Sequence, residues 1–172
     1  MREIERIYIH CSDSLWGNLE EIRRWHTDPP PEGRGWSDIG YHWLVTNFFP
    51  YYASYKDSKP IGEFDGMVWA GRLESIIGAG VHGDNHHTIH ICLVGVDAFS
   101  PKQVDAAAHL ASRKCLEYGL TAEEVWGHCE YWTKRGEEPK KSCPNLAMPM
   151  FRRQVEQLLA QIPPITPLPE IS

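Results

Sequence analysis

The chain has 172 residues, a length that suits a single domain with a full hydrophobic core. Its 17 Lys and Arg against 23 Asp and Glu give a net charge of −6, which disfavours nucleic-acid backbones and anionic membrane surfaces as partners. No apolar run reaches the roughly 18 residues that span a bilayer, and the charged residues 1–6 lack the apolar stretch of a signal peptide. We therefore expect synthesis in the cytoplasm, no membrane insertion and no nucleic-acid partner.

Three segments have the composition of β-strands. Residues 4–10 and 41–46 are short and rich in β-branched and aromatic side chains. Residues 88–94 form a nearly continuous apolar run, which is typical of a central strand covered on both faces. Because helices are predicted between and after these strands, we expect an α/β fold in which helices flank a central mixed sheet.

The predicted helices begin at recognisable capping residues. Asn18 stands three residues before Glu21, the spacing of a capping box, and three consecutive prolines follow this helix. Ser100 precedes a proline and stands three residues before Gln103, which predicts a second helix start. The expected helices span 19–27, 101–118 and 149–161.

Two segments do not fit regular elements. Residues 47–63 join two predicted strands, hold five aromatic side chains and are too long for a hairpin loop. This insertion either packs over the core through its own aromatics, covers a site or binds a partner. Residues 163–172 contain four prolines and are expected to form a flexible tail after a single catalytic domain over 1–162.

Nine histidines and five cysteines stand out in the composition. The cysteines are odd in number and scattered, which predicts reduced thiols and not a disulfide scaffold. Histidine and cysteine suit zinc, and a catalytic zinc site uses three protein ligands. His10 lies at the end of a predicted strand, and His128 and Cys143 lie in predicted loops, but spacing alone favours no particular trio.

An ordered series of short motifs is more specific. Ile-His-Cys-Ser occurs at 9–12, Gly-Tyr-His at 40–42, Gly-His at 127–128 and Ser-Cys-Pro at 142–144. The series resembles the zinc-dependent N-acetylmuramoyl-L-alanine amidases of the phage-lysozyme type (amidase type 2), which share a fold with the peptidoglycan recognition proteins. The resemblance covers about residues 4–153 and implies the same central mixed sheet flanked by helices.

The resemblance also implies the site residues. His10, His128 and Cys143 match the zinc ligands, Tyr41 matches the catalytic tyrosine, and Lys141 matches a lysine that acts beside the metal. Zinc would activate water, Lys141 would stabilise the oxyanion, and Tyr41 would orient the water and relay protons. Without the family context, Tyr41 would be interpreted as a core residue and Lys141 as a solvated charge.

The other histidines and cysteines have structural interpretations. His26 and His42 are expected to support the sheet or the site through hydrogen bonds and not to act as ligands. Cys143 follows His128 by 15 positions, a longer gap than in the short phage members of the family, and the enlarged loop at 129–142 is expected to border the cleft and to help select the peptide. We expect the rest as follows: His82, His86 and His87 at the cleft rim, His90 in a strand, His109 on a helix surface, Cys129 pointing away from the site, and Cys11, Cys92 and Cys115 in the core.

The function implied by the resemblance is cleavage of the amide bond between N-acetylmuramic acid and L-alanine of peptidoglycan. It implies a phage or prophage endolysin that acts as a monomer on the cell wall, with peptidoglycan or muropeptide as its partner. A cytoplasmic amidase that recycles muropeptides and a non-catalytic peptidoglycan-binding module are the alternatives. The presence of Cys143 beside both histidines counts against the binding module, since such modules typically lose the cysteine.

Overall fold

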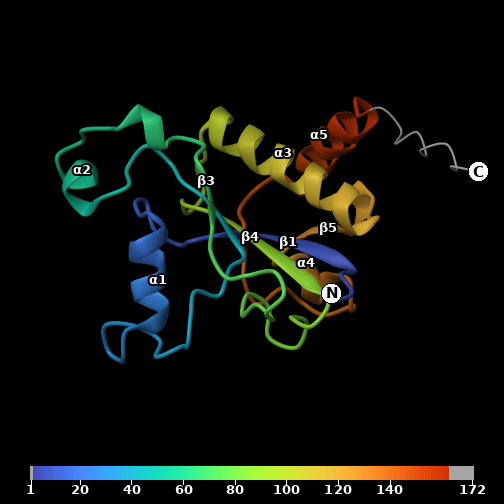
Figure 1. Ribbon diagram of the computed structural model, residues 1–172, viewed down its shortest axis with the longest axis horizontal. Coiled ribbons are helices and arrows are strands. Elements are labelled where there is room, and N and C mark those ends of the chain that lie inside the picture. The colour runs from blue at the N-terminus through green and yellow to red at the C-terminus, as the bar shows by residue number, and fades with distance from the viewer. Residues whose placement is uncertain (1, 163–172) are drawn as a thin grey trace, which may run out of the picture.

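The computed structural model describes residues 2–162, so the tail predicted at 163–172 lies outside the described residues. Five strands form one sheet in the order β3-β2-β4-β1-β5 (Figure 1). The strands are β1 (Arg6–Cys11), β2 (Trp43–Val45), β3 (Val68–Ala70), β4 (Thr88–Leu93) and β5 (Val125–Gly127). Four of them run parallel and β3 is antiparallel to β2, which confirms the predicted mixed sheet.

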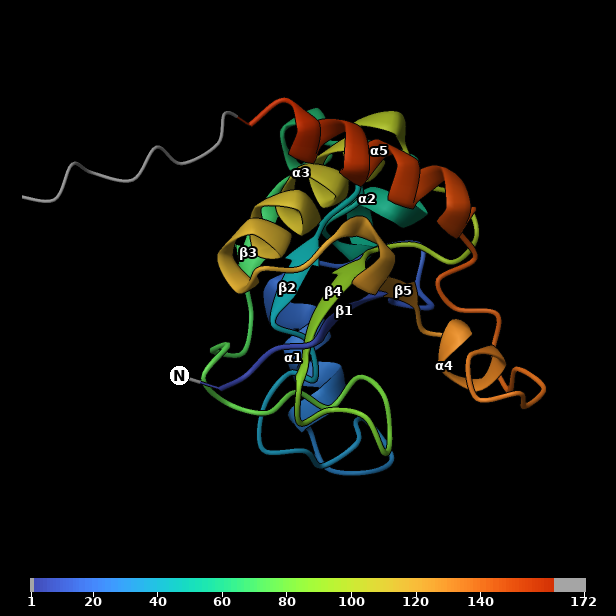
Figure 2. The same ribbon diagram turned by 90° about the vertical axis from the view of Figure 1, so that its right-hand side faces the viewer.

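Helices cover both faces of this sheet. α3 and α5 lie on one face and α1 lies on the other (Figure 2). The helices are α1 (Leu19–Thr27), α2 (Tyr52–Lys56), α3 (Pro101–Tyr118), α4 (Glu130–Thr133) and α5 (Met148–Ala160), with 3₁₀ turns at Gly62–Phe64 and Ala122–Glu124. Within residues 2–162, no helix has the length and apolar character needed to cross a membrane.

The alternation of side chains along β1 separates a core face from a site face. Ile7 and Ile9 are fully buried in the cluster under α3 and α5. Tyr8 and His10 point to the opposite face because successive strand residues alternate. The sheet face that α1 partly covers therefore carries polar, titratable side chains in its buried rows.

The start of α3 follows the sequence signature only in part. The Ser100 hydroxyl accepts a hydrogen bond from the Gln103 backbone N–H at 3.0 Å, as an N-cap should. A complete capping box would also require the Gln103 side chain to accept a hydrogen bond from the Ser100 backbone N–H, and it does not. It is fully buried and donates to the backbone carbonyls of Val45 at 3.0 Å and Val94 at 2.8 Å. Gln103 thus ties α3 to the ends of β2 and β4.

The second strand is shorter than predicted. The expected strand at 41–46 is β2, Trp43–Val45, and Tyr41 and His42 precede it. The carbonyls of these two residues still accept hydrogen bonds from the backbone N–H groups of Arg72 and Gly71, at 2.9 and 2.8 Å. Tyr41 therefore stays hydrogen-bonded to the neighbouring segment just before β2, and its half-buried ring packs against the core cluster that contains Ile22 and Ile39.

The aromatic insertion at 47–63 packs through its own rings. It contains α2 and the start of a 3₁₀ turn, and the Phe48 and Phe49 rings pack edge to face with 4.7 Å between centroids. The Gly17 N–H donates to the Phe49 carbonyl at 2.9 Å, which joins the insertion to the loop before α1. Figure 1 shows α2 beside the amino end of α1.

Candidate active site

The candidate site forms where two parallel strands end. β1 and β5 are neighbours, so their carboxyl ends meet at the same edge of the sheet. His10 is the penultimate residue of β1, and His128 follows β5 directly. The His128 N–H donates to the Ile9 carbonyl at 3.1 Å, which extends the strand pairing by one bond. This register brings the two imidazoles to a centroid distance of 4.8 Å.

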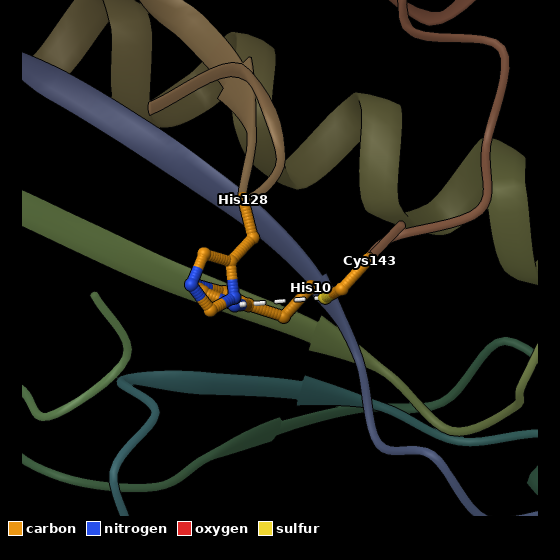
Figure 3. Close-up of side chains that lie close together, drawn as sticks. All are labelled: His10, His128 and Cys143. Atoms are coloured by element: carbon orange, nitrogen blue, oxygen red, sulfur yellow. Dashed lines mark hydrogen bonds between the residues drawn. The ribbon is translucent and has the colours of Figure 1, made fainter. Parts of the chain in front are cut away.

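Cys143 reaches the same point from the loop that follows α4. Its carbonyl accepts from the Cys129 N–H at 2.7 Å, and its Sγ accepts from the Cys11 N–H at 3.3 Å. The sulfur lies 4.0 Å from His10 Nδ1, the contact drawn as a dashed line in Figure 3. One ligand atom each from His10, His128 and Cys143 lies within 4.8 Å of the others.

The protonation of the two histidines fits a metal site. Burial lowers the pKa of His10 well below its usual range and that of His128 to about 4, and the Lys141 charge lowers both further. Both imidazoles are therefore neutral near pH 7 and offer lone pairs. A hydrogen bond with the Cys11 thiol and burial raise the pKa of the Cys143 thiol, whereas the Cys11 backbone N–H lowers it. Two neutral imidazoles and one sulfur form a donor set that suits zinc.

The predicted catalytic residues lie beside this group. Tyr41 has its ring centroid 5.2 Å from that of His10, and burial raises the pKa of its hydroxyl well above the ordinary value. Tyr41 is thus a neutral donor at physiological pH. Lys141 is exposed, two residues before Cys143, and lines the same cleft as Tyr41 and His128. The fold therefore brings all five predicted site residues together.

A cleft opens over the site. Its walls come from the loop after β1, the segment 26–41, the loop 79–82 and the segment 128–145. Within the described residues, the insertion 47–63 contributes nothing to the lining, so it does not cover the site. The loop at 129–142 does border the cleft, as predicted, through Trp132 and Lys141.

Comparison with known proteins agrees with this geometry. Residues 1–145 match the family described as N-acetylmuramoyl-L-alanine amidase. The chain belongs to this amidase family. The endolysin of Enterobacteria phage T3 is 35% identical over 125 residues, which cover 66% of this chain and 68% of the phage protein. The resemblance inferred from the motifs is confirmed, and the chain is an enzyme that cleaves peptidoglycan at the amide between N-acetylmuramic acid and L-alanine.

Solved structures extend the comparison to the fold. The amidase LysC from Clostridium intestinale URNW superposes with a TM-score of 0.67 at 19% identity, over 90% of this chain and 86% of that one. Wild-type Drosophila PGRP-LB superposes with a TM-score of 0.58 at 21% identity, over 93% and 79% of the two chains. These likenesses confirm the predicted amidase and peptidoglycan-recognition fold.

The remaining histidines and cysteines of the amidase can be compared with their predicted positions. His26 Nδ1 accepts from the Gly40 N–H at 3.1 Å next to Tyr41, which confirms its supporting role. Cys11, Cys92 and Cys115 are buried core residues, as predicted. Cys11 also lines the cleft, and its backbone N–H donates to Cys143 Sγ. Only His82 of the three expected rim histidines lines the cleft.

Trp132 lies in the loop 129–142 that was predicted to border the cleft, but no contact with a candidate ligand was predicted for it. Its ring stacks on His128 with centroids 5.2 Å apart and an interplanar angle of 18°. This stacking holds the His128 imidazole in place. Trp132 also lines the cleft and so forms part of its wall. A tryptophan four residues beyond a candidate ligand was the available signal, but the loop conformation was needed to interpret it.

Buried neutral histidines predict that the metal-free amidase loses stability in acid. Burial is the main cause that lowers the pKa of His26 and of His42 to about 4, against about 6.5 in an unfolded chain. Between these values the folded state binds fewer protons than the unfolded state, so the free energy of unfolding falls as the pH drops from 6.5 to 4.

A pair of variants tests this dependence. His26→Gln should reduce the pH slope of the free energy of unfolding by about one bound proton in that window, measured by urea unfolding with chelator present. His109→Gln is the matched control, because His109 lies exposed on α3. Equal slopes for His26→Gln and the parent protein would contradict the interpretation.

Proposed function

We propose that the chain acts as an endolysin whose zinc ion is held by His10, His128 and Cys143. The observation that carries this proposal is the convergence of these three side chains from three separate segments. His128 and Cys143 line the cleft, and His10 is buried against them. They occupy the positions of the family motifs named above. The endolysins of Escherichia phage T7 and Klebsiella phage KP32 are 34% and 30% identical to the chain, which supports the same biological role.

Lys141 and Tyr41 supply the catalytic roles that a bound zinc would not. The chemistry that a bound zinc supplies is activation of water and polarisation of a carbonyl group. Lys141 places a positive charge at the cleft wall, where it stabilises negative charge that develops on the amide oxygen. Tyr41 is neutral and lies beside His10, so its hydroxyl orients the attacking water and relays the proton that this water loses to the departing amine of L-alanine, which leaves Tyr41 neutral again.

The cleft walls account for substrate capture without bulk charge. Trp36 and Trp132 offer flat apolar surfaces, and Arg34 and Lys141 offer positive charges along the same cleft. Because the whole chain carries a net charge of −6, local cleft chemistry has to attract an anionic wall polymer. We propose that the enzyme works as a monomer on peptidoglycan in the cell wall.

The biological role is tested on two substrates. The purified protein is expected to clear a suspension of intact sacculi, to lose this activity with a zinc chelator and to regain it when zinc is added. Soluble anhydro-muropeptides are offered in parallel. Activity on soluble fragments alone would replace the endolysin role by muropeptide recycling, and binding without cleavage of either substrate would contradict an enzymatic role.

A further inference from the structure

We propose that His90 is a positioning residue that holds His10 in the one tautomer able to present Nδ1 to a metal. His90 lies on β4, between Thr88 and Cys92 on the same sheet face, and no step of the mechanism above uses it. The proposal rests on His10 being a zinc ligand. It assigns a role to a fully buried histidine that was predicted only to lie in a strand.

The proton positions follow from a chain of hydrogen bonds that begins at a backbone carbonyl. The Thr88 hydroxyl donates to the Asp84 carbonyl at 2.9 Å, and a carbonyl can only accept. A hydroxyl has one proton, so Thr88 Oγ1 must act as the acceptor toward His90 Nε2, 3.1 Å away. His90 therefore carries its ring proton on Nε2.

The tautomer of His90 determines the tautomer of His10. With its proton on Nε2, a neutral His90 has a bare Nδ1, and this atom lies 3.1 Å from His10 Nε2. His10 Nε2 must then carry the proton and donate it. The other nitrogen of His10, Nδ1, is left with a free lone pair, and it is the atom that faces Cys143 Sγ at 4.0 Å. Three successive bonds thus prepare His10 as a ligand.

Aromatic stacking fixes the plane of the His90 ring. Tyr8 lies on one side with a centroid distance of 5.8 Å and an interplanar angle of 11°, and His42 on the other with 5.5 Å and 7°. His42 Nδ1 also accepts from the His90 backbone N–H at 2.9 Å. The ring cannot tilt without breaking contact with one neighbour, so its two nitrogens keep their directions toward His10 and Thr88.

The segment 78–80 closes over the His10–His90 bond and requires glycine to do so. A Cβ at Gly80 would lie 2.5 Å from His90 Nδ1 and 2.9 Å from His10 Nε2, the two atoms that share the hydrogen bond. A Cβ at Gly78 would lie 2.4 Å from His90 Cδ2. The chain is thus shaped around the paired rings, which shields their hydrogen bond from water.

The opposite arrangement is less favourable for two reasons. It would need Thr88 to donate to His90, which would leave the Asp84 carbonyl without this partner. It would also place the His10 proton on Nδ1, between that nitrogen and the metal, so the proton would have to leave before binding. Partners of this kind around metal-binding histidines typically change metal affinity about 10- to 100-fold.

Two substitutions at position 90 separate the hydrogen bond from the packing. His90→Leu fills the space but gives His10 Nε2 no acceptor, and we expect the zinc dissociation constant to rise about 10- to 100-fold. His90→Asn places an amide oxygen near the position of Nδ1, and we expect it to restore most of the affinity. A role in packing alone would make the leucine variant bind zinc as tightly as the parent protein.

Two threonine variants test the series of hydrogen bonds without changing either histidine ring. Thr88→Val removes the hydroxyl that orients His90, and we expect a smaller rise in the zinc dissociation constant than for His90→Leu. Thr46→Val is the matched control, because the Thr46 hydroxyl is also buried and also donates to a carbonyl, that of Phe64 at 2.6 Å. The hydrogen bonds of the Thr46 hydroxyl run to Phe64, Met67 and Trp69 and not to His90 or His10, so its variant should keep the parent affinity.

Nitrogen-15 NMR of the metal-free protein decides the inference independently of zinc. In the parent protein, His10 should be protonated on Nε2 and bare on Nδ1, and Thr88→Val should produce a mixture of both tautomers. A parent His10 protonated on Nδ1, or no change of tautomer in Thr88→Val, would overturn the role of His90. If the tautomer is as expected but no zinc binds at His10, the proposed zinc site fails and the positioning of His10 stands.

Discussion

Replacing Cys143 by serine is expected to remove zinc from the purified enzyme and to lower kcat/KM by more than about 10³-fold. A serine hydroxyl stays protonated at neutral pH and cannot replace a thiolate as a zinc ligand. Two imidazoles alone hold the metal weakly. Without the metal, water keeps a pKa near 15.7 in place of about 7, so little hydroxide is available for attack.

The measurement pairs metal analysis after dialysis with the rate of sacculus clearing. Cys129→Ser is the matched control, since Cys129 neighbours His128 in the chain but belongs to no group of potential metal ligands within residues 2–162. It should keep one zinc per chain and the parent activity. A Cys143→Ser enzyme with full zinc content would show that the sulfur is not a ligand.

Replacing Tyr41 by phenylalanine should have the second largest effect. The ring stays in its contacts with His10 and His26, at centroid distances of 5.2 and 5.3 Å, while the hydroxyl is lost. If that hydroxyl donates the proton to the leaving amine, kcat should fall about 10²- to 10⁴-fold, the usual contribution of a general acid. Zinc content should not change.

Kinetics on a soluble muropeptide that the parent enzyme cleaves separate this role from binding. We expect kcat to fall with KM nearly constant, because the interaction is made in the transition state. Tyr55→Phe serves as the control, since Tyr55 lies in the insertion and not in the cleft lining. A Tyr41→Phe enzyme with the parent kcat would remove Tyr41 from the mechanism.

The sequence predicted the long elements of the fold well and the short ones poorly. β4 and α3 have enough residues for an apolar run or a helical stripe to be recognised. β3 and β5 have three residues each, too few for any periodicity to appear. They exist because neighbouring strands supply hydrogen bonds, and pairing of that kind is not visible in local sequence.

The site residues could not be identified from local sequence patterns either. Spacing could not select His10, His128 and Cys143 because the parallel pairing of β1 with β5 and a long returning loop bring them together. Only the family motifs identified them in advance. His90 was missed because its role depends on the register of β1 with β4, in which Tyr8 pairs with His90 and His10 with Cys92.

Mass analysis of the fragments released from purified peptidoglycan identifies the bond that the enzyme cleaves. We expect intact glycan strands that carry free lactyl carboxylates, together with stem peptides that begin with a free L-alanine amine. New reducing-end sugars with the stem peptides still attached to muramic acid would contradict this expectation.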